Sequence, residues 1–330
     1  MTNILEDFGL DMGEDDEEKG YDLILVDGQN ILHRASHSNA HLCVERDDGS
    51  TVLTGATYGF FQIVPAIWER YSAPGGQLIV CWDAGYKHRT DIFPDYKAAR
   101  RDKDVSAMEP HHLDIPNQSK AVKRLLRIAG WPQARAADFE ADDVMATLAA
   151  RAAGKRVAIC TTDQDLHQCV TDTTHVISPK WGTSEDTIWT PEAVLEKWGV
   201  EPKRVPEAKA LAGDSSDGIP GCPGCGKGWA KKLLATETLA QVLDKAPLGV
   251  LTGEFEGKVW KSPSLSTKIT ENRDLILTCL KLATTVDDCP VKMEHPKMDA
   301  PRLLEAFARL EFNSLRDHAS FRTLERIGSP

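Results

Sequence analysis

The chain has 330 residues, of which 41% are hydrophobic and 27% charged, which is ordinary for a globular protein and long enough for two domains. It contains no apolar run of about 18 residues, and its N-terminus lacks the features of a signal peptide, so we expect a cytoplasmic protein rather than a membrane or secreted one. The net charge of −11 does not exclude nucleic acid as a partner, because the first twenty residues hold eight acids and one lysine.

Alternating apolar and amphipathic segments indicate the fold of the first 190 residues. Short apolar runs predict buried strands, and helical periodicity predicts helices between them. The expected strands are residues 23–26, 77–82, 156–160, 176–179 and 187–189, and the expected helices are residues 30–38, 57–71 and 119–129. This alternation is typical of an α/β fold with a parallel sheet flanked by helices.

The remaining segments define the expected domain organisation. Residues 1–20 are typical of an acidic, disordered tail, residues 45–52 of a polar turn, and residues 84–118 of a charged, mobile segment. From Pro191 onward the pattern is mainly helical. We therefore expect an α/β domain over residues 21–190 and a helical region over residues 191–330.

Acidic residues gather at the ends of the expected strands and at the start of one helix. The strand-terminal acids are Asp27, Asp83, Asp163 and Asp165, and the acids before the helix are Glu140, Asp142 and Asp143. A single aspartate of this kind is more often a turn or cap residue. Because the carboxyl ends of parallel strands form one edge of a sheet, we expect all these side chains to converge. Carboxylates without histidine favour Mg²⁺ or Mn²⁺, and two such ions are typical of phosphodiester hydrolysis.

The sequence FEADDVMATLAA at residues 139–150 has two interpretations. Glu140 can be the N-cap of a helix, with Asp142 and Asp143 in the first turn, where carboxylates complement the helix dipole. The same acids can also bind metal. In a regular helix Glu140 and Asp142 would point about 200° apart. If both bind metal, Glu140 must therefore lie outside the helix proper.

Residues 88–103 form a basic run interleaved with Tyr and Phe. Taken alone, this run is typical of a solvated loop. Beside a cluster of carboxylates, Lys97, Arg100 and Arg101 can hold a phosphate that the acids would otherwise repel. In the same segment, Tyr96 can stack on a base.

Residues 213–234 are rich in glycine and lead into a helix that contains lysines. Backbone amides at such a helix start can bind phosphate without reading base sequence, although an ordinary turn between two helices is the alternative. The same segment contains Cys222 and Cys225 as a CxxC pair. With no second pair and no histidine set nearby, the pattern does not favour zinc or disulfide chemistry.

With these motifs together, the chain resembles the 5′→3′ exonuclease and flap endonuclease family, which includes the N-terminal nuclease domain of bacterial DNA polymerase I and free-standing phage enzymes. The matching segments occur in the family's order, at residues 25–35, 82–101, 139–149, 160–170 and 210–234. The resemblance implies a PIN-like domain followed by a helix–three-turn–helix DNA-binding region. It also implies a metal-dependent enzyme that cuts DNA near a 5′ end, a flap or a single-strand/double-strand junction.

The resemblance implies a role for each candidate residue. One metal would be surrounded by Asp27, Asp83, Glu140 and Asp142, and a second by Asp142, Asp163, Asp165 and Asp217, with Asp143 and Asp214 close by. Lys97 and Arg100 would hold the scissile phosphate in an arch or clamp segment, and Arg34 would lie near the DNA. The glycine-rich loop would grip the duplex, commonly with a K⁺ ion, through residues that include Gly221, Gly224, Gly226, Lys227 and Lys231.

The chain departs from the family pattern mainly in this loop. The family usually has Asn at the position of Gly218 and Thr at the position of Trp229, and Lys227 lies one place early. These departures count against the K⁺ site and the duplex grip. The segment after Arg101 is short, which favours a modest clamp over a large arch, and no polymerase domain follows, so we expect a free-standing nuclease.

Three other functions remain open at this point. The chain could be a non-catalytic, structure-specific DNA-binding protein of the same fold. It could be a PIN-type ribonuclease, because no motif indicates recognition of a 2′-hydroxyl. An aspartyl-phosphate phosphohydrolase is suggested by the Asp-x-Asp pattern of Asp163 and Asp165, but that chemistry requires the pattern after an early strand, where Asp27 has no second acid.

Overall fold

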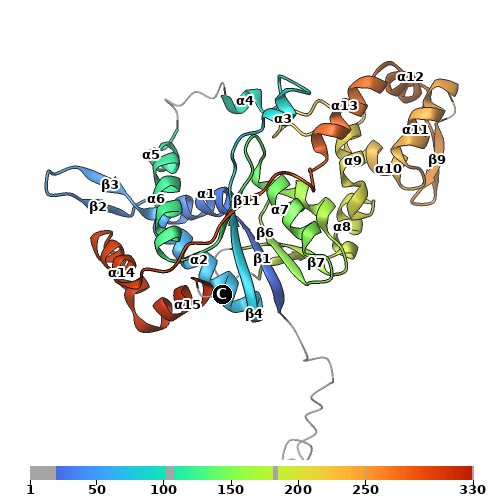
Figure 1. Ribbon diagram of the computed structural model, residues 1–330. Helices are drawn as coiled ribbons and strands as arrows, with labels where there is room; N and C mark the ends of the chain where they lie inside the picture. Colours follow the sequence, from blue (N-terminus) through green and yellow to red (C-terminus); the bar gives the residue numbers. More distant parts are fainter. Residues whose placement is uncertain (1–19, 102–107, 181–184, 250, 329–330) are drawn as a thin grey trace, which may run out of the picture.

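The computed structural model describes residues 20–101, 108–180, 185–249 and 251–328 (Figure 1). Its centre is a seven-stranded sheet with the strand order β11-β5-β4-β1-β6-β7-β8. The strands are β1 (Tyr21–Asp27), β4 (Ser72–Cys81), β5 (Gln133–Arg135), β6 (Val157–Cys160), β7 (Thr174–Ser178), β8 (Thr187–Trp189) and β11 (Lys292–Glu294). The inner strands pair in parallel, and the edge strands β8 and β11 pair antiparallel. The expected α/β fold with a mostly parallel sheet is therefore confirmed.

The alternation of side chains along β1 produces one core on each face of the sheet. Ile24 and Val26 belong to one core, whereas Leu23 and Leu25 belong to the other. The first core includes residues of α1 (Gly28–Ser38), α2 (Gly55–Tyr71), α6 (Ile115–Ile128), α14 (Ala300–Arg309) and α15 (His318–Gly328). The second includes residues of α7 (Ala141–Arg151), α8 (Pro191–Trp198) and the 3₁₀ helix η4 (Gln164–Cys169).

A third core lies in the helical region at the end of the molecule away from α14 and α15 (Figure 1). Its helices are α9 (Val205–Ala212), α10 (Lys227–Leu234), α11 (Leu239–Lys245), α12 (Pro263–Glu271) and α13 (Arg273–Ala283). The strands β9 (Thr252–Phe255) and β10 (Lys258–Lys261) form an antiparallel hairpin beside them, which the sequence did not predict. The described residues also include the short 3₁₀ helices η5 (Pro202–Arg204), η6 (Ala246–Leu248) and η7 (Asn313–Arg316).

The C-terminal segment does not belong to the helical region, contrary to the prediction for residues 191–330. β11 pairs with β5 at the edge of the central sheet. Leu303 and Phe307 of α14 and Leu324 of α15 are buried in the same core as α2 and α6. Residues 292–328 therefore return to the sheet, because these amphipathic helices bury their apolar faces there.

Three segments differ in detail from the sequence-based expectation. The expected turn at residues 45–52 is the tip of a hairpin between β2 (Cys43–Glu45) and β3 (Thr51–Leu53). The charged segment 84–118 contains the short helices α3 (Lys87–Thr90), α4 (Ala98–Arg101) and α5 (Pro110–Leu113), and α6 begins within it. The predicted acidic tail lies outside the described residues, apart from Gly20. None of the helices in the described ranges has the length and apolarity needed to cross a membrane.

Candidate active site

The carboxyl ends of the central strands bring Asp27 and its neighbours together. Asp27 pairs with Cys81 of β4, and Val26 pairs with Cys160 of β6, so the three strands end side by side. Asp27 is the N-cap of α1: its Oδ1 accepts a hydrogen bond from the backbone N–H of Asn30 at 2.9 Å. Its Oδ2 accepts one from the hydroxyl of Thr161 at 2.9 Å. Strand end and helix start together hold this carboxylate rigidly.

Four acids lie close enough to perturb each other. Burial, followed by the charges of Asp83 and Asp163, raises the pKa of Asp27 to about 7. Burial raises the pKa of Asp142 well above its ordinary value, and Asp163, Asp27 and Asp83 add to the shift. The pKa of Asp83 also rises through the protein atoms packed around it and the charge of Glu140, although part of its surface is open to solvent.

These four acids have no cationic partner among the ion pairs of the described residues. Carboxylates without a cationic partner, of which Asp27, Asp83 and Asp142 have a raised pKa, are a donor set that fits a hard divalent cation. We call Asp27, Asp83, Asp142 and Asp163 the open acids.

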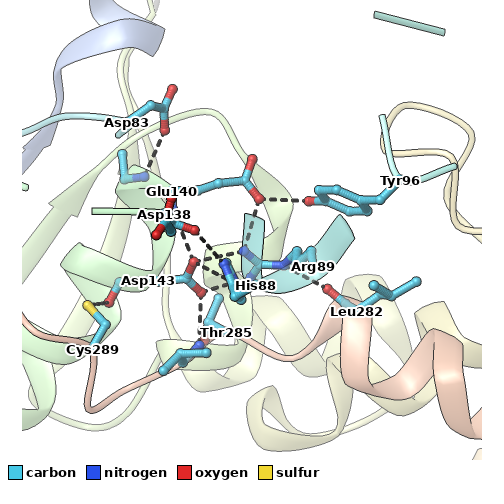
Figure 2. Close-up of polar contacts among 12 residues, drawn as sticks. Asp83, His88, Arg89, Tyr96, Asp138, Glu140, Asp143, Leu282, Thr285 and Cys289 are labelled. Carbon is cyan, nitrogen blue, oxygen red and sulfur yellow. Dashed lines mark hydrogen bonds and ion pairs between the residues drawn. The ribbon is translucent and has the colours of Figure 1, made fainter. Parts of the chain in front are cut away.

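Glu140, in contrast, has two cationic partners, Arg89 and Lys97. Figure 2 shows its contacts with Arg89 and Tyr96. Its carboxylate forms ion pairs with Arg89 at 2.9 Å and with Lys97, and it accepts a hydrogen bond from the hydroxyl of Tyr96 at 2.8 Å. Glu140 is the N-cap of α7 and has an extended backbone, so it lies outside the helix proper, as its proposed role required. Asp83 reaches the same helix start, where its Oδ1 accepts a hydrogen bond from the N–H of Ala141 at 2.7 Å.

Asp143 is fully buried and is held from three directions (Figure 2). Arg89 donates two hydrogen bonds to it, at 2.7 and 2.8 Å. His88 Nε2 lies 3.3 Å from its Oδ2, and the backbone N–H of Val286 donates to its Oδ1 at 2.9 Å. Asp143 therefore ties α7 to α3 and to the segment after α13. Arg89 and His88 lie in the basic run, but only the structure shows that they bind these acids.

Lys97 and Arg100, the residues expected to hold a phosphate, contact acids in this structure. Lys97 and Arg100 form ion pairs with Asp217 at 3.5 and 2.7 Å. Tyr96 is only 2% exposed, and its hydroxyl contacts Glu140 and also Asp217, the latter at 3.3 Å. The prediction that Tyr96 stacks on a base is therefore wrong, because its ring is buried in the helical core.

The acids Asp165 and Asp214 share one partner, Lys209 of α9. Lys209 is buried and forms an ion pair with each of them, at 2.8 Å to Asp214. Burial alone would raise the pKa of Asp214, but hydrogen bonds from Lys209 and Ser216 outweigh it and lower the pKa to about 2. The sequence did not single out Lys209, because a lysine within an apolar helix pattern has no distinctive motif.

A cleft of about 810 Å³ is lined by Asp163, one of the open acids, and by residues of the glycine-rich loop. Its lining includes Asn30 at the start of α1, Asp163, Lys209 and the exposed Lys227 of α10. The loop turns sharply, with positive φ at Gly213, Gly218, Gly221 and Gly224. Gly226 is the N-cap of α10, and a Cβ placed there would meet no atom within 4 Å. The start of α10 is therefore open at Gly226, and the next residue, Lys227, lines the cleft.

Other predicted DNA-binding residues lie elsewhere. Lys231 donates a hydrogen bond to the carbonyl of Glu196 at 3.2 Å and lies against Gly199, so its amine is directed at α8. Arg34 lines a separate hollow of about 410 Å³ beside α2. Arg101 ends α4, and its side chain is outside the described part of the chain.

Cys222 and Cys225 are buried free thiols of the helical core.

Comparison with protein-family models identifies two consecutive matches. Residues 22–199 match the model described as "5'-3' exonuclease, N-terminal resolvase-like domain". Residues 200–304 match the model described as "5'-3' exonuclease, C-terminal SAM fold". The chain belongs to the 5′-3′ exonuclease family.

Curated relatives of this 5′-3′ exonuclease family member include DNA polymerases. DNA polymerase I of Bacillus subtilis is 32% identical over 320 residues, and the thermostable DNA polymerase I of Thermus aquaticus is 32% identical over 309 residues. The matches cover 93% and 91% of this chain but only 32% and 33% of those proteins. The chain thus spans about a third of the length of the curated relatives it matches.

Solved structures share the fold over nearly the whole chain. The T5 D15 protein co-crystallised with metal ions superposes with a TM-score of 0.60 at 21% identity, and the match covers 92% of this chain and 98% of that one. Flap endonuclease-1 from Methanococcus jannaschii superposes with a TM-score of 0.52 at 17% identity, covering 93% of this chain and 92% of that one.

Proposed function

We propose that this chain is a divalent-metal-dependent nuclease that hydrolyses DNA phosphodiester bonds near 5′ ends, flaps or single-strand/double-strand junctions. The observation that carries the proposal is the set of open acids at the carboxyl edge of the sheet. Family membership supports nuclease activity. The solved neighbours support DNA as the substrate, since one is a T5 D15 flap endonuclease complex with DNA and metal ions and another is the Rad2 catalytic core with a DNA substrate. A cytoplasmic location accords with this role.

We assign Mg²⁺ or Mn²⁺ to the open acids, since carboxylate oxygens suit these ions. When bound, two such ions supply a hydroxide from water and stabilise charge on the phosphate. Glu140 would join Asp27, Asp83 and Asp142 at one ion, and Asp165 and Asp217 would join Asp142 and Asp163 at the other. Each of Glu140, Asp165 and Asp217 would then exchange a lysine or arginine partner for the ion. The raised pKa of Asp27, about 7, supports this assignment, because a bound cation would favour the charged form of a carboxylate that burial and neighbouring acids disfavour.

The other residues of the site position the substrate in this proposal. The side chain of Arg100 is 54% exposed and retains donors beyond its bond to Asp217, so it can bind a phosphate oxygen. Lys97 would join it by leaving Glu140. Lys227 and the open backbone at the start of α10 would contact the duplex backbone across the cleft, which predicts strongly salt-dependent binding. Comparing duplex binding in K⁺ and Li⁺ salts of equal ionic strength tests for a K⁺ ion at this loop.

Substitution of the open acids tests the metal assignment. Asp27→Asn and Asp142→Asn should each abolish Mg²⁺-dependent cleavage of a 5′-labelled flap substrate while the variants still bind duplex DNA. Asp91→Asn is the matched control, because Asp91 is exposed and pairs only with Lys87 among the described ion pairs. Cleavage by both Asp27→Asn and Asp142→Asn at the wild-type rate would refute the assignment. Cleavage by the wild type in EDTA, without added Mg²⁺ or Mn²⁺, would refute the metal dependence.

A panel of substrates distinguishes the proposed activity from its alternatives. We expect product formation from 5′-flap, nicked and blunt duplexes with Mg²⁺, and product lengths will define the balance of exonuclease and flap cleavage. Binding to these substrates without any product would indicate a non-catalytic DNA-binding protein. Preferential cleavage when the 5′ strand is RNA would indicate a ribonuclease.

A further inference from the structure

Three histidines that the proposed nuclease chemistry does not use meet at the junction of α1 and α5. His37 lies in the last turn of α1, and His111 and His112 are the middle residues of α5. One ring nitrogen from each lies within 4.8 Å of the other two. The ring centroids are 4.5 Å apart for His37 and His112 and 5.5 Å apart for His37 and His111. Two segments separated by more than seventy residues of sequence thus converge through their imidazoles.

Ring nitrogens of the three histidines lie close to one another. Nε2 of His37 and Nε2 of His112 are 3.1 Å apart. Nε2 of His111 is buried and has no hydrogen-bond partner among the described residues. A buried ring nitrogen without a partner is costly. A metal ion bound by one nitrogen from each of the three rings would give this nitrogen a partner.

The chemistry of three imidazoles selects the class of metal. Histidine nitrogens suit Zn²⁺, Ni²⁺, Co²⁺ or Cu²⁺, whereas Mg²⁺ prefers oxygen ligands. Tetrahedral Zn²⁺ with bonds of about 2.0 Å holds its nitrogen ligands roughly 3.3 Å from one another. The His37–His112 separation of 3.1 Å is close to this value. Small rotations of the side chains would bring the third nitrogen to the same range.

We propose that His37, His111 and His112 bind a transition-metal ion such as Zn²⁺ at a site separate from the open acids. His37 lies ten residues after Asp27, the N-cap of the same helix, which is about 15 Å along the helix axis. The ion joins α5 to the end of α1. In the chain, α5 follows α4, which contains Arg100, so the ion anchors residues 110–113 of the charged segment 84–118 on the α/β domain.

Cobalt binding tests this site directly, because tetrahedral Co²⁺ bound to imidazoles absorbs visible light far more strongly than octahedral Co²⁺ bound to carboxylates and water. The full chain is titrated with Co²⁺ in the presence of excess Mg²⁺, which occupies the open acids. We expect one equivalent with an intense visible band, displaced by Zn²⁺, and a higher melting temperature with Zn²⁺ present. The band should persist in Asp27→Asn, which separates this site from the proposed nuclease centre.

Substitution of the histidines completes the test. His37→Gln, His111→Gln and His112→Gln should each weaken Co²⁺ binding by about tenfold or more and remove the Zn²⁺-dependent rise in melting temperature. His41→Gln is the matched control, since His41 is an exposed histidine near the end of α1 that lies outside the cluster. The proposal is overturned if the wild type shows no intense band, or if the triple variant binds Co²⁺ as the wild type does. Circular dichroism of the metal-free variants verifies that they fold.

Discussion

The guanidinium of Arg89 forms two hydrogen bonds with the carboxylate of Asp143, at 2.7 and 2.8 Å, in a place where both side chains are buried. The same guanidinium bonds Glu140 at 2.9 Å and the carbonyl of Leu282 at 3.1 Å. One arginine thus links α3, the start of α7 and the end of α13. It positions the helix that carries Asp142, without itself being one of the predicted site residues.

Removal of Arg89 should destabilise the protein strongly. Arg89→Ala leaves Asp143 buried and without its main cationic partner, so we expect the free energy of unfolding to fall by about 3–5 kcal/mol. Chemical denaturation measures this loss. Lys87→Ala on the same short helix removes only an exposed pair with Asp91 and should leave stability nearly unchanged. An equal loss in the free energy of unfolding for the two substitutions would contradict the stabilising role of Arg89.

Stability of the metal-free protein should depend on pH through the open acids. The pKa of Asp27 is about 7 in the folded chain and has its ordinary value of 3.8 when unfolded. Between these values the folded state binds more protons, so this carboxyl contributes less to stability as pH rises from about 4 to 7. Each unit of pKa difference corresponds to about 1.4 kcal/mol.

The comparison of wild type with Asp27→Asn in EDTA isolates this effect. The variant should gain stability relative to wild type as pH rises from 5 to 8, because an amide has no charge to desolvate. Mg²⁺ should make the wild type the more stable of the two, because it stabilises only the wild type. The melting temperatures of both proteins at pH 5 and pH 8, in EDTA and in Mg²⁺, measure these differences. A difference in melting temperature between the two proteins that does not change with pH would contradict the raised pKa of Asp27.

Two glycines of the loop and its helix should respond oppositely to alanine. Gly221 has φ of +67°, and a Cβ there would lie 2.3 Å from the backbone nitrogen of Gly213, so Gly221→Ala should unfold the loop and weaken duplex binding. Gly228 lies in α10 with no atom within 4 Å of a new Cβ, so Gly228→Ala should stabilise by about 0.5–1 kcal/mol. Denaturation and duplex titration of both variants measure the contrast. A neutral Gly221→Ala would show that the loop conformation does not require glycine.

Tyr96 should act through its hydroxyl and not through stacking on DNA. Tyr96→Phe removes the buried hydrogen bond to Glu140 and should lower the free energy of unfolding by about 1 kcal/mol with duplex affinity unchanged. Stopped-flow or equilibrium binding to a 5′-flap substrate provides the affinity. If Tyr96→Phe kept full stability while Tyr96→Leu specifically lost DNA affinity, a stacking role would be restored.

The sequence by itself determined the α/β class and the strand-terminal acids, because both depend on local periodicity. Apolar runs that end in Asp27 and Asp83 predict buried strands, and parallel pairing then brings their carboxyl ends to one edge. The segment around Glu140 shows how far this reasoning extends. Helix geometry required Glu140 to lie outside α7 if it binds metal together with Asp142, and the extended backbone at this N-cap position meets the requirement.

Only the tertiary structure decided which acids are left without a cation. Lys209 and Arg89 were not among the residues singled out from the sequence, and Lys97 was expected to hold a phosphate. Their partners lie far along the chain, so no local pattern reveals that these residues neutralise Asp165, Asp143 and Glu140. The return of residues 292–328 to the sheet and the meeting of His37 with α5 have the same origin. Such contacts depend on long-range packing of buried surfaces, whereas periodicity reports only which face of a segment is buried.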